Sequence, residues 1–429
     1  MCIRKCLLIN EINTMKKIDI YCVFGLLIVL AAFTSCAPGN GQKKNNLIME
    51  KGTFGYDLEF LEKHGDMIVL SGNENKAQVI ISPEYQGKVF TSTAEGLEGK
   101  SFGWINYELL ESDTILDHMN AYGGEDRLWV GPEGGQFSIF FKPGGGMNID
   151  NWFTPAPIDT ESWELISKSQ NKVEMEKKMA LKNYSGSEFN LRINRNINLF
   201  NIEKANDLLG IRIPGSVNWV GYGSENIMTN IGDNAWTRET GTLSIWMLDM
   251  FSPGDHITVV IPFQKGDEKE LGPVATTDYF GEITSERIKY TDSVVFFRVD
   301  GKKRRKLGLT PKRAKPVAGS YDAENKVLTI VKYSIPDEAT EYINQLWKWQ
   351  ENPFNGDVMN AYNDGPLEDG SQMGPFYEIE SSSPAAFLGK GESITHYHNV
   401  FHFAGPEDQL DQLSVKILGV TLEDIKQAW

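Results

Sequence analysis

Short runs of alternating apolar and polar residues recur along the chain from about residue 53 to residue 403. Most runs are bounded by Gly, Asn, Asp or Pro, as at Ser71-Gly72-Asn73. Because the side chains of a strand alternate between its two faces, this two-residue period predicts β-strands. The pattern is clearest in residues 67–71, 77–82, 137–142, 189–197, 258–263, 293–299 and 327–333.

Helical periodicity is rare in this sequence. Residues 337–349 are one candidate helix, and residues 407–418 with 422–429 are expected to form a helical tail. The tail has an apolar stripe that should pack on a sheet, formed by Leu410, Leu413 and Ile417. With no short repeat and no Gly/Ser-rich linker between residues 53 and 403, we predict an all-β fold. It would be one large antiparallel β-sandwich domain (residues 51–405) followed by the tail (residues 406–429).

The N-terminal segment has the features of a secretory signal. Met15-Lys16-Lys17 is basic, residues 20–33 are mostly apolar, and Thr34-Ser35-Cys36 resembles a bacterial lipobox. We therefore expect residues 1–35 to be a signal peptide with its true start at Met15. Cys36 would become the lipidated first residue of the mature chain, and residues 36–50 would be a polar tether. A transmembrane anchor is the alternative, but the apolar run is shorter than the roughly 20 residues that a spanning helix needs.

Cysteine content and charge narrow the possible partners. The only cysteines are Cys2, Cys6, Cys22 and Cys36, so a chain acylated at Cys36 has no thiol left for disulfides or Cys-ligated metals. A net charge of −16 argues against nucleic acid as a partner. The exception is a basic run at 302–306, followed by Lys312, Arg313 and Lys315. It is either a solvated hairpin edge or a contact for an acidic sugar or a phosphate headgroup.

Three segments are dense in residues that carry chemistry, and the first spans residues 120–135. Glu125, Arg127 and Trp129 alternate, which predicts a carboxylate, a guanidinium and an indole in a row on one strand face. An arginine beside a glutamate lowers the pKa of the carboxyl and orients both groups. The row would contact a ligand, or it would be a buried ion pair beside a packing tryptophan.

The second segment, residues 352–366, is predicted to be a loop, because Asn, Asp, Gly and Pro each favour turns. The oxygens of Asp357, Asn360 and Asn363 would hold sugar hydroxyls at the rim of a groove, or Ca²⁺. The spacing does not match an EF-hand loop, because no glutamate closes it at the required position. We expect no cofactor, and Ca²⁺ in this loop is the open alternative.

The third segment, residues 376–403, contains two alternating runs on either side of a Gly-Lys-Gly turn. Glu378 and Glu380 share a face of the first run, and His396, His398 and His402 share a face of the second. If both strands lie in the same sheet, carboxylates and imidazoles line one surface suited to acid–base chemistry. Two other interpretations are open: hydrogen bonding on a half-polar sheet, and a zinc site built from His-x-His and a glutamate.

Together these segments resemble the galactose mutarotase-like (aldose epimerase-like) superfamily, in a Bacteroidetes branch of lipoproteins. The resemblance is carried by Tyr-Gly-Gly-Glu-Asp-Arg-Leu-Trp-Val-Gly-Pro-Glu (122–133), Gly-Asp-Val-Met-Asn-Ala-Tyr-Asn-Asp-Gly-Pro (356–366) and Tyr-Glu-Ile-Glu-Ser-Ser-Ser-Pro (377–384). It implies a β-supersandwich whose concave sheet binds carbohydrate. Because no acidic residue closely follows Cys36, the resemblance to this group favours the periplasmic side of the outer membrane.

The resemblance also implies roles for individual residues. Mutarotases use a glutamate as base and a histidine as acid without a cofactor, which points to Glu378 or Glu380 and to His396 or His398. The Asn-His motif of the family is absent, and His118-Met119-Asn120 has the reverse order. The residues expected to bind the sugar are Glu125, Arg127, Trp129, Glu133, Asp357, Asn360 and Asn363.

We expect a lipid-anchored monomer whose partner is a carbohydrate. Three functions are consistent with these features. The first is aldose epimerase-like catalysis by Glu/His acid–base chemistry. The second is cleavage of a glycosidic bond, as a glycoside hydrolase with paired carboxylates or as a polysaccharide lyase. The third is carbohydrate binding without catalysis.

Overall fold

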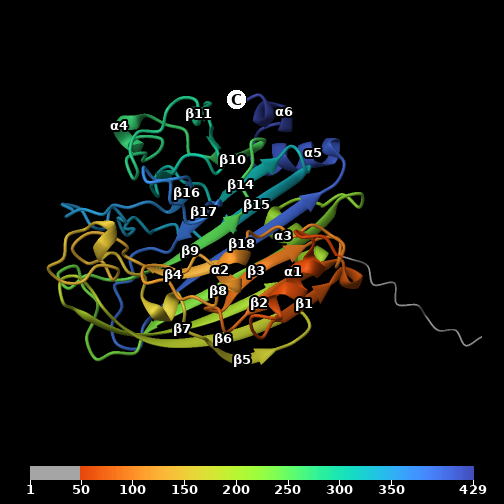
Figure 1. Cartoon of the computed structure of the whole chain (residues 1–429). Coiled ribbons are helices and arrows are strands. Elements are labelled where there is room, and N and C mark those ends of the chain that lie inside the picture. The colour runs from red at the N-terminus through yellow and green to blue at the C-terminus, as the bar shows by residue number, and fades with distance from the viewer. Residues whose placement is uncertain (1–48) are drawn as a thin grey trace, which may run out of the picture. The chain divides into compact units, whose positions relative to one another are not determined.

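Two antiparallel β-sheets pack face to face in the computed structural model, which describes residues 49–429 (Figure 1). The larger sheet has ten strands. In spatial order they are β11 (Ile288–Tyr290), β12 (Val294–Arg298), β10 (Ile257–Pro262), β14 (Val317–Asp322), β15 (Val327–Tyr333), β18 (Ser393–Ala404), β8 (Asn218–Asn230), β7 (Glu188–Leu199), β6 (Lys172–Lys182) and β5 (Glu164–Lys168).

The smaller sheet has five strands and lies against the larger one. Its order is β13 (Arg305–Leu309), β16 (Met359–Asn363), β17 (Tyr377–Ser382), β9 (Ser244–Phe251) and β4 (Arg127–Gly131). Every residue of β16, β17, β9 and β4 is buried. Both faces of this sheet are therefore covered, one by the larger sheet and the other by connecting segments that enclose a pocket.

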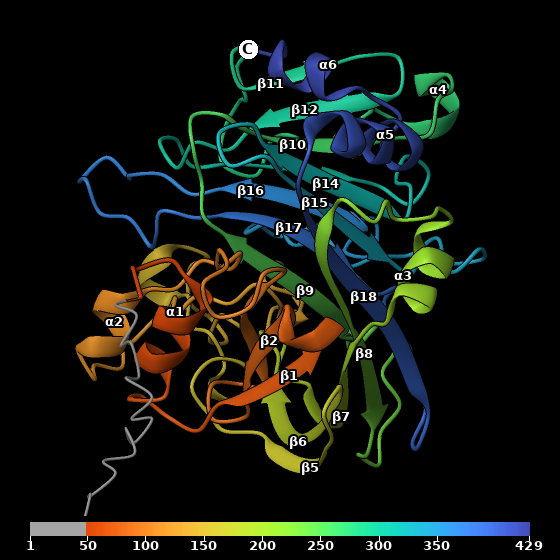
Figure 2. The same ribbon diagram turned by 90° about the vertical axis from the view of Figure 1, so that its right-hand side faces the viewer.

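A third sheet and several short helices complete the fold. The three-stranded sheet consists of β1 (Ile68–Gly72), β2 (Ala77–Ser82) and β3 (Lys88–Thr93). The α-helices are α1 (Phe54–Leu61), α2 (Tyr107–Glu111), α3 (Ile202–Leu209), α4 (Glu268–Leu271), α5 (Glu407–Ile417) and α6 (Leu422–Lys426). Three 3₁₀ turns span Asn73–Asn75, Ile149–Asn151 and Ala156–Ile158. Figure 2 shows α3 and α5 beside the long strands of the larger sheet.

The expected fold class and the helical tail are confirmed. The strands predicted at 77–82 and 327–333 coincide with β2 and β15. The other predicted strands, except 137–142, differ from observed strands by one or two residues at each end. In the tail, Leu410 and Leu413 are buried and Ile417 is partly buried. They pack with Leu328, Ile330, Phe401 and other apolar side chains of the larger sheet. The prediction that the apolar stripe of the tail packs on a sheet is therefore confirmed.

Two predicted elements are wrong. Residues 337–349 form no helix, because Tyr342 is fully buried and its backbone N–H donates to the carbonyl of Phe354 at 3.2 Å, a long-range pairing. Residues 137–142 are irregular instead of forming a strand, apart from an isolated antiparallel bridge between Phe141 and Trp152. There the hydroxyl of Ser138 donates to the carbonyl of Glu133 and accepts from the N–H of Phe140, which satisfies the backbone locally.

The signal peptide, Cys36 and most of the tether lie outside the described residues. Within residues 49–429, no helix is long and apolar enough to cross a membrane.

Candidate functional site

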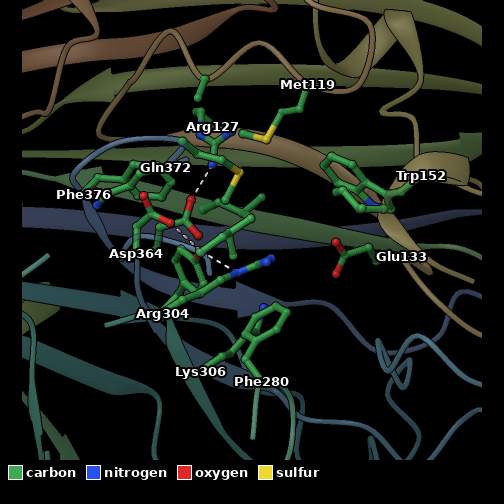
Figure 3. Close-up of a pocket in the computed structure, with 18 of the residues that line it drawn as sticks. Met119, Arg127, Glu133, Trp152, Phe280, Arg304, Lys306, Asp364, Gln372 and Phe376 are labelled. Carbon is green, nitrogen blue, oxygen red and sulfur yellow. Dashed lines mark hydrogen bonds and ion pairs between the residues drawn. The ribbon is translucent and has the colours of Figure 1, made fainter. Parts of the chain in front are cut away.

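A pocket of about 550 Å³ lies on the face of the smaller sheet that points away from the larger sheet (Figure 3). Its floor is made by side chains of the sheet, including Trp129, Trp246, Leu248, Glu378 and Glu380. Its walls come from connecting segments that contribute Leu116, Met119, Trp152, Phe280, Trp347, Asp364, Gln372 and Phe376. Aromatic faces and buried charges therefore meet in one cavity.

The alternation of β17 carries two glutamates into this pocket, and each forms a buried ion pair. Glu378 pairs with Arg127 of β4 at 2.5 Å, and Glu380 pairs with Lys306 of β13 at 2.7 Å. The indole N–H of Trp246 also donates to Glu380 at 2.9 Å. Oε1 of Glu380 is buried and has no hydrogen-bond partner within residues 49–429. It is an acceptor available to a hydroxyl of a ligand.

A third glutamate, Glu133, differs from this pair because it makes no ion pair in the part of the chain that the structure describes. Its side chain is partly accessible at the pocket wall and otherwise surrounded by protein. Burial raises the pKa of Glu133 to about 7, although the charge of Lys306 acts in the opposite direction. At neutral pH this carboxyl therefore exists in both protonation states, as acid–base catalysis requires.

Burial also raises the pKa of Glu378, while the Arg127 guanidinium opposes the rise. The contact between the two groups is the longest-range ion pair of the site, since the residues are 251 positions apart in sequence. Arg127 also lies 5.2 Å from the ring centre of Trp129. The Trp129 ring therefore packs beside the guanidinium of this pair.

Two residues of the basic run also line the pocket, because alternate side chains point inward at Arg304 and Lys306. The guanidinium of Arg304 lies 4.0 Å from the ring centre of Phe280, and its Nε donates to the hydroxyl of Tyr362 at 3.1 Å. By contrast, Lys302 is exposed and pairs with Asp255. One end of the run is therefore a solvated edge, whereas Arg304 and Lys306 at the other end line the cavity.

The histidines do not share a surface with the glutamates. Ser381, next to Glu380 in sequence, hydrogen-bonds to His396 and His398 at 2.8 Å each on the opposite face of β17. His398 also contacts Asp249 of β9 at 2.8 Å. The expectation of one common surface is wrong, because β17 and β18 belong to different sheets. His396 and His398 are fully buried between these sheets and do not line the pocket.

Glu125 lies away from the pocket, so the predicted row of side chains holds only for Arg127 and Trp129. The carboxylate of Glu125 accepts from the backbone N–H of Ser92 at 2.9 Å and approaches His402 at 3.5 Å. The backbone before β4 is irregular, because Gly123 has a φ of +97° and a Cβ there would lie 2.1 Å from the carbonyl of Trp104. Strand alternation therefore does not extend back to Glu125.

The segment predicted to be a rim loop is partly a strand. Residues 359–363 form β16 and are buried, because pairing with β13 and β17 outweighs their turn propensity. Asp357 accepts from Tyr279 at 2.7 Å, Asn360 donates to the carbonyl of Leu307 at 3.3 Å, and Asn363 accepts from the N–H of Gly301 at 3.0 Å. These three residues hydrogen-bond to segments in and near β13, and they do not line the pocket. Across residues 49–429, no three His, Cys, Asp or Glu side chains are grouped to hold a metal ion.

Several pocket residues were not identified from the sequence, among them Trp152, Trp246, Phe280, Trp347, Tyr362 and Asp364. Tyr362 and Asp364 alternate with Asn363 in β16 and its extension, so strand periodicity could have placed them on one face had β16 been recognised. Trp246 lies in β9, within a continuous apolar run of the kind that is typical of a buried strand. Trp152, Phe280 and Trp347 come from segments without a periodic pattern that would have placed them.

The fold and the pocket define an all-β protein with a ligand-sized cavity that combines aromatic walls with buried ion pairs. The chain belongs to the family of unknown function DUF6786, whose model matches residues 52–429. No curated protein matches the sequence.

Several solved structures resemble this one over about four fifths of the chain. The Slr1438 protein from Synechocystis is 14% identical with a TM-score of 0.46, and the match covers 80% of this chain and 96% of that protein. A galactose mutarotase related enzyme from Lactobacillus acidophilus is 9% identical with a TM-score of 0.44, covering 80% and 99%. A galactose mutarotase-like protein from Lactobacillus casei is 10% identical with a TM-score of 0.43, covering 79% and 100%.

Proposed function

We propose that the protein binds a sugar in this pocket and catalyses aldose epimerase-like proton transfer, with Glu133 as acid and Glu380 as base. One observation carries the proposal: two carboxyl groups in different electrostatic environments face the same aromatic cavity. Burial raises the pKa of Glu133 to about 7, and Glu380 is paired with Lys306. Carboxyls whose environments differ in this way can take opposite roles in proton transfer.

The aromatic lining supports a sugar as the ligand. Trp129, Trp152, Trp246 and Trp347 all line the cavity, and the apolar face of a sugar ring packs well on an indole. Ionised groups at the base of the pocket supply the polar contacts that fix the orientation of such a ligand. In this proposal the Arg127–Glu378 pair hydrogen-bonds to sugar hydroxyls.

The proposed reaction opens the ring of a free aldose and closes it again. Oε1 of Glu380 takes the proton of the anomeric hydroxyl, and a carbonyl forms at the anomeric carbon. As the bond between that carbon and the ring oxygen breaks, protonated Glu133 donates its proton to the ring oxygen. Closure on the other face of the carbonyl returns both protons and yields the other anomer, so no oxidant or cofactor is consumed.

This assignment moves the role of acid from the histidines to a glutamate. His396 and His398 are enclosed between the two sheets and have no contact with the cavity. A general acid must lie within hydrogen-bond reach of the atom it protonates, or within reach through one water molecule.

The test is NMR measurement of anomer interconversion for a panel of free aldoses, with wild-type protein and with Glu133→Gln and Glu380→Gln. We expect acceleration by the wild type and a loss of orders of magnitude in both variants, with binding largely retained. Glu341→Gln is the matched control, because Glu341 pairs with Arg238 outside the pocket. If wild-type protein accelerates no aldose in the panel, the catalytic proposal is wrong.

A second candidate, carbohydrate binding without catalysis, is favoured by one observation. Glu378 and Glu380 are both engaged in buried ion pairs, an arrangement that positions ligands well without any proton transfer. In that case Glu133→Gln and Glu380→Gln would bind sugars with nearly the affinity of the wild type, and wild-type protein would accelerate no interconversion.

We also propose that the mature protein is anchored by a lipid on Cys36, on the periplasmic side of the outer membrane. Support comes from the basic and apolar segments that precede Cys36 in the sequence. Metabolic labelling with a radioactive fatty acid should label the wild type and leave Cys36→Ser unlabelled. Equal labelling of both proteins would show that Cys36 is not the acylated residue.

A further inference from the structure

Arg304 is held in a fixed position in the pocket wall by uncharged partners. Its guanidinium lies 4.0 Å from the ring centre of Phe280, and its Nε donates to the Tyr362 hydroxyl at 3.1 Å. The Tyr362 hydroxyl in turn donates to Asp364 at 2.7 Å. In Figure 3 the end of the Arg304 side chain points into the cavity, with Glu133 on one side and Asp364 on the other.

The charge of Arg304 is not matched by a direct ion pair. Arg127 and Lys306 each pair with a glutamate of β17, at 2.5 and 2.7 Å. Within residues 49–429, the Arg304 guanidinium has no carboxylate within 4.0 Å, and it is linked to Asp364 only through the Tyr362 hydroxyl. Among the cations that line the pocket, Arg304 is therefore the one whose charge is left for a ligand.

The hydrogen-bonding capacity of Arg304 is also incomplete. Only Nε has an acceptor in the described part of the chain, so Nη1 and Nη2 are available at the cavity surface. A guanidinium presents its N–H groups in a planar fork that matches an acidic group with two parallel hydrogen bonds. The stacking on Phe280 fixes the plane of this fork in advance, which reduces the entropy lost on binding.

We propose that the ligand of this pocket is an acidic sugar, with one singly charged carboxylate or sulfate group bound by Arg304. This inference rests on the proposed sugar-binding function and adds the chemical class of the sugar. A single negative charge matches the single unpaired cation. A doubly charged group would also meet repulsion from Asp364 and from the ionised form of Glu133.

The experiment measures affinities by isothermal titration calorimetry with the full-length protein in detergent. The probes are galacturonic acid, glucuronic acid and galactose 6-sulfate, with galactose and glucose as neutral counterparts. We expect at least one acidic probe to bind roughly tenfold or more tightly than its neutral counterpart, as a charge-assisted bidentate contact would give. The preference should decrease with added salt. The carboxylate and sulfate probes show which acidic group the site prefers.

Variants then test whether Arg304 causes the preference for acidic over neutral sugars. Arg304→Met should abolish the preference, so that acidic sugars bind no more tightly than their neutral counterparts. Arg304→Lys should retain part of the preference, because a lysine keeps the charge but not the planar fork. Lys302→Met is the matched control, since Lys302 belongs to the same basic run but pairs with Asp255 outside the pocket. It should behave as the wild type. Thermal melting confirms that each variant is folded.

The outcomes separate this inference from the function on which it rests. If wild-type protein binds acidic and neutral sugars equally, or if the preference survives in folded Arg304→Met, the acidic ligand is refuted and the sugar site stands. If no sugar of either kind binds to the wild type, the sugar-binding proposal fails and this inference fails with it.

Discussion

Glu380 and Ser381 are neighbours in β17, and their side chains point to opposite faces of the smaller sheet. Glu380 faces the pocket and pairs with Lys306 at 2.7 Å. Ser381 faces the larger sheet and hydrogen-bonds to His396 and His398 at 2.8 Å each. One strand thus separates carboxylates that a ligand can reach from histidines that are enclosed between the sheets.

We predict that Glu133 sets the alkaline limit of the proposed activity. Burial raises its pKa to about 7, and the protonated form is the proposed acid, so kcat/KM should fall as the pH rises through about 7. Glu133→Gln should lower kcat/KM by roughly 10²–10⁴-fold and remove this pH dependence. The measurement is the pH profile of kcat/KM for anomer interconversion. An unchanged alkaline limb in the variant would assign the titration to another group.

The effects of substituting Arg127 and Glu378 on the free energy of unfolding should depend strongly on each other. Both side chains are buried, at 3% and 7% exposure, so removing one partner leaves an uncompensated charge in the protein interior. Arg127→Met or Glu378→Met should lower the free energy of unfolding by roughly 3–5 kcal/mol, and the double variant should lose less than the sum of the two. Urea denaturation measures all three variants.

The control for this cycle is the exposed pair Lys390–Asp233, where Lys390→Met should leave the unfolding free energy nearly unchanged. Strictly additive losses in the double variant would show that Arg127 and Glu378 do not interact in solution as they do in the structure.

His396 should make the protein less stable in acid. Burial, with a further contribution from His398, lowers the pKa of His396 from 6.5 to about 3. Below about pH 6.5 the unfolded chain therefore binds a proton that the folded protein does not bind. Above about pH 6.5 the titration of His396 costs no stability. As the pH drops from about 6.5 toward about 3, this titration should lower the free energy of unfolding, with a slope of up to about 1.4 kcal/mol per pH unit.

The variant that tests this prediction is His396→Gln, because glutamine does not titrate and can still hydrogen-bond to Ser381. Unfolding free energies are compared between wild type and variant as a function of pH, and only the difference in slope is evaluated. Carboxyl groups titrate equally in both proteins, so they cancel from this difference. Parallel curves through the acidic range would contradict the assigned pKa shift.

Gly365 should be necessary for the position of Arg304. A Cβ at residue 365 would lie 2.4 Å from the backbone nitrogen of Lys303 and 2.5 Å from that of Arg304, so the backbone would have to move. Gly365→Ala should destabilise the protein by roughly 1–3 kcal/mol and weaken any preference for acidic sugars. Calorimetric affinities and urea denaturation measure both effects. Gly215→Ala is the control, because a Cβ at residue 215 meets no atom within 4 Å.

Local patterns in the sequence identified much of the fold. The alternating runs at 77–82 and 327–333 are strands with the predicted boundaries, and Leu410 and Leu413 of the tail pack as their spacing indicated. The same local reasoning failed at 359–363, where the composition favours turns but pairing with two neighbouring strands imposes β16. Such strand pairing depends on residues that are distant in sequence, so it cannot be predicted from a local pattern.

The candidate site shows the same division. Glu378, Glu380, Arg127, Trp129 and Glu133 were singled out from the sequence, and the structure places all five around one pocket. Glu125, Asp357, Asn360, Asn363 and the two histidines were singled out by the same criteria, and the structure places them elsewhere. Residue type and spacing do not distinguish the two groups.

The sequence by itself determined the strand-rich class of this protein and which side chains share a face within each strand, because both are local properties of the backbone. The tertiary structure alone decided what each face meets: β17 and β18 enter different sheets, so the glutamates line a pocket while the histidines are buried. It also decided that Arg127 would pair with Glu378, 251 residues away. The physical reason is that ion pairing and burial depend on distance in space, which the order of residues along the chain does not reveal.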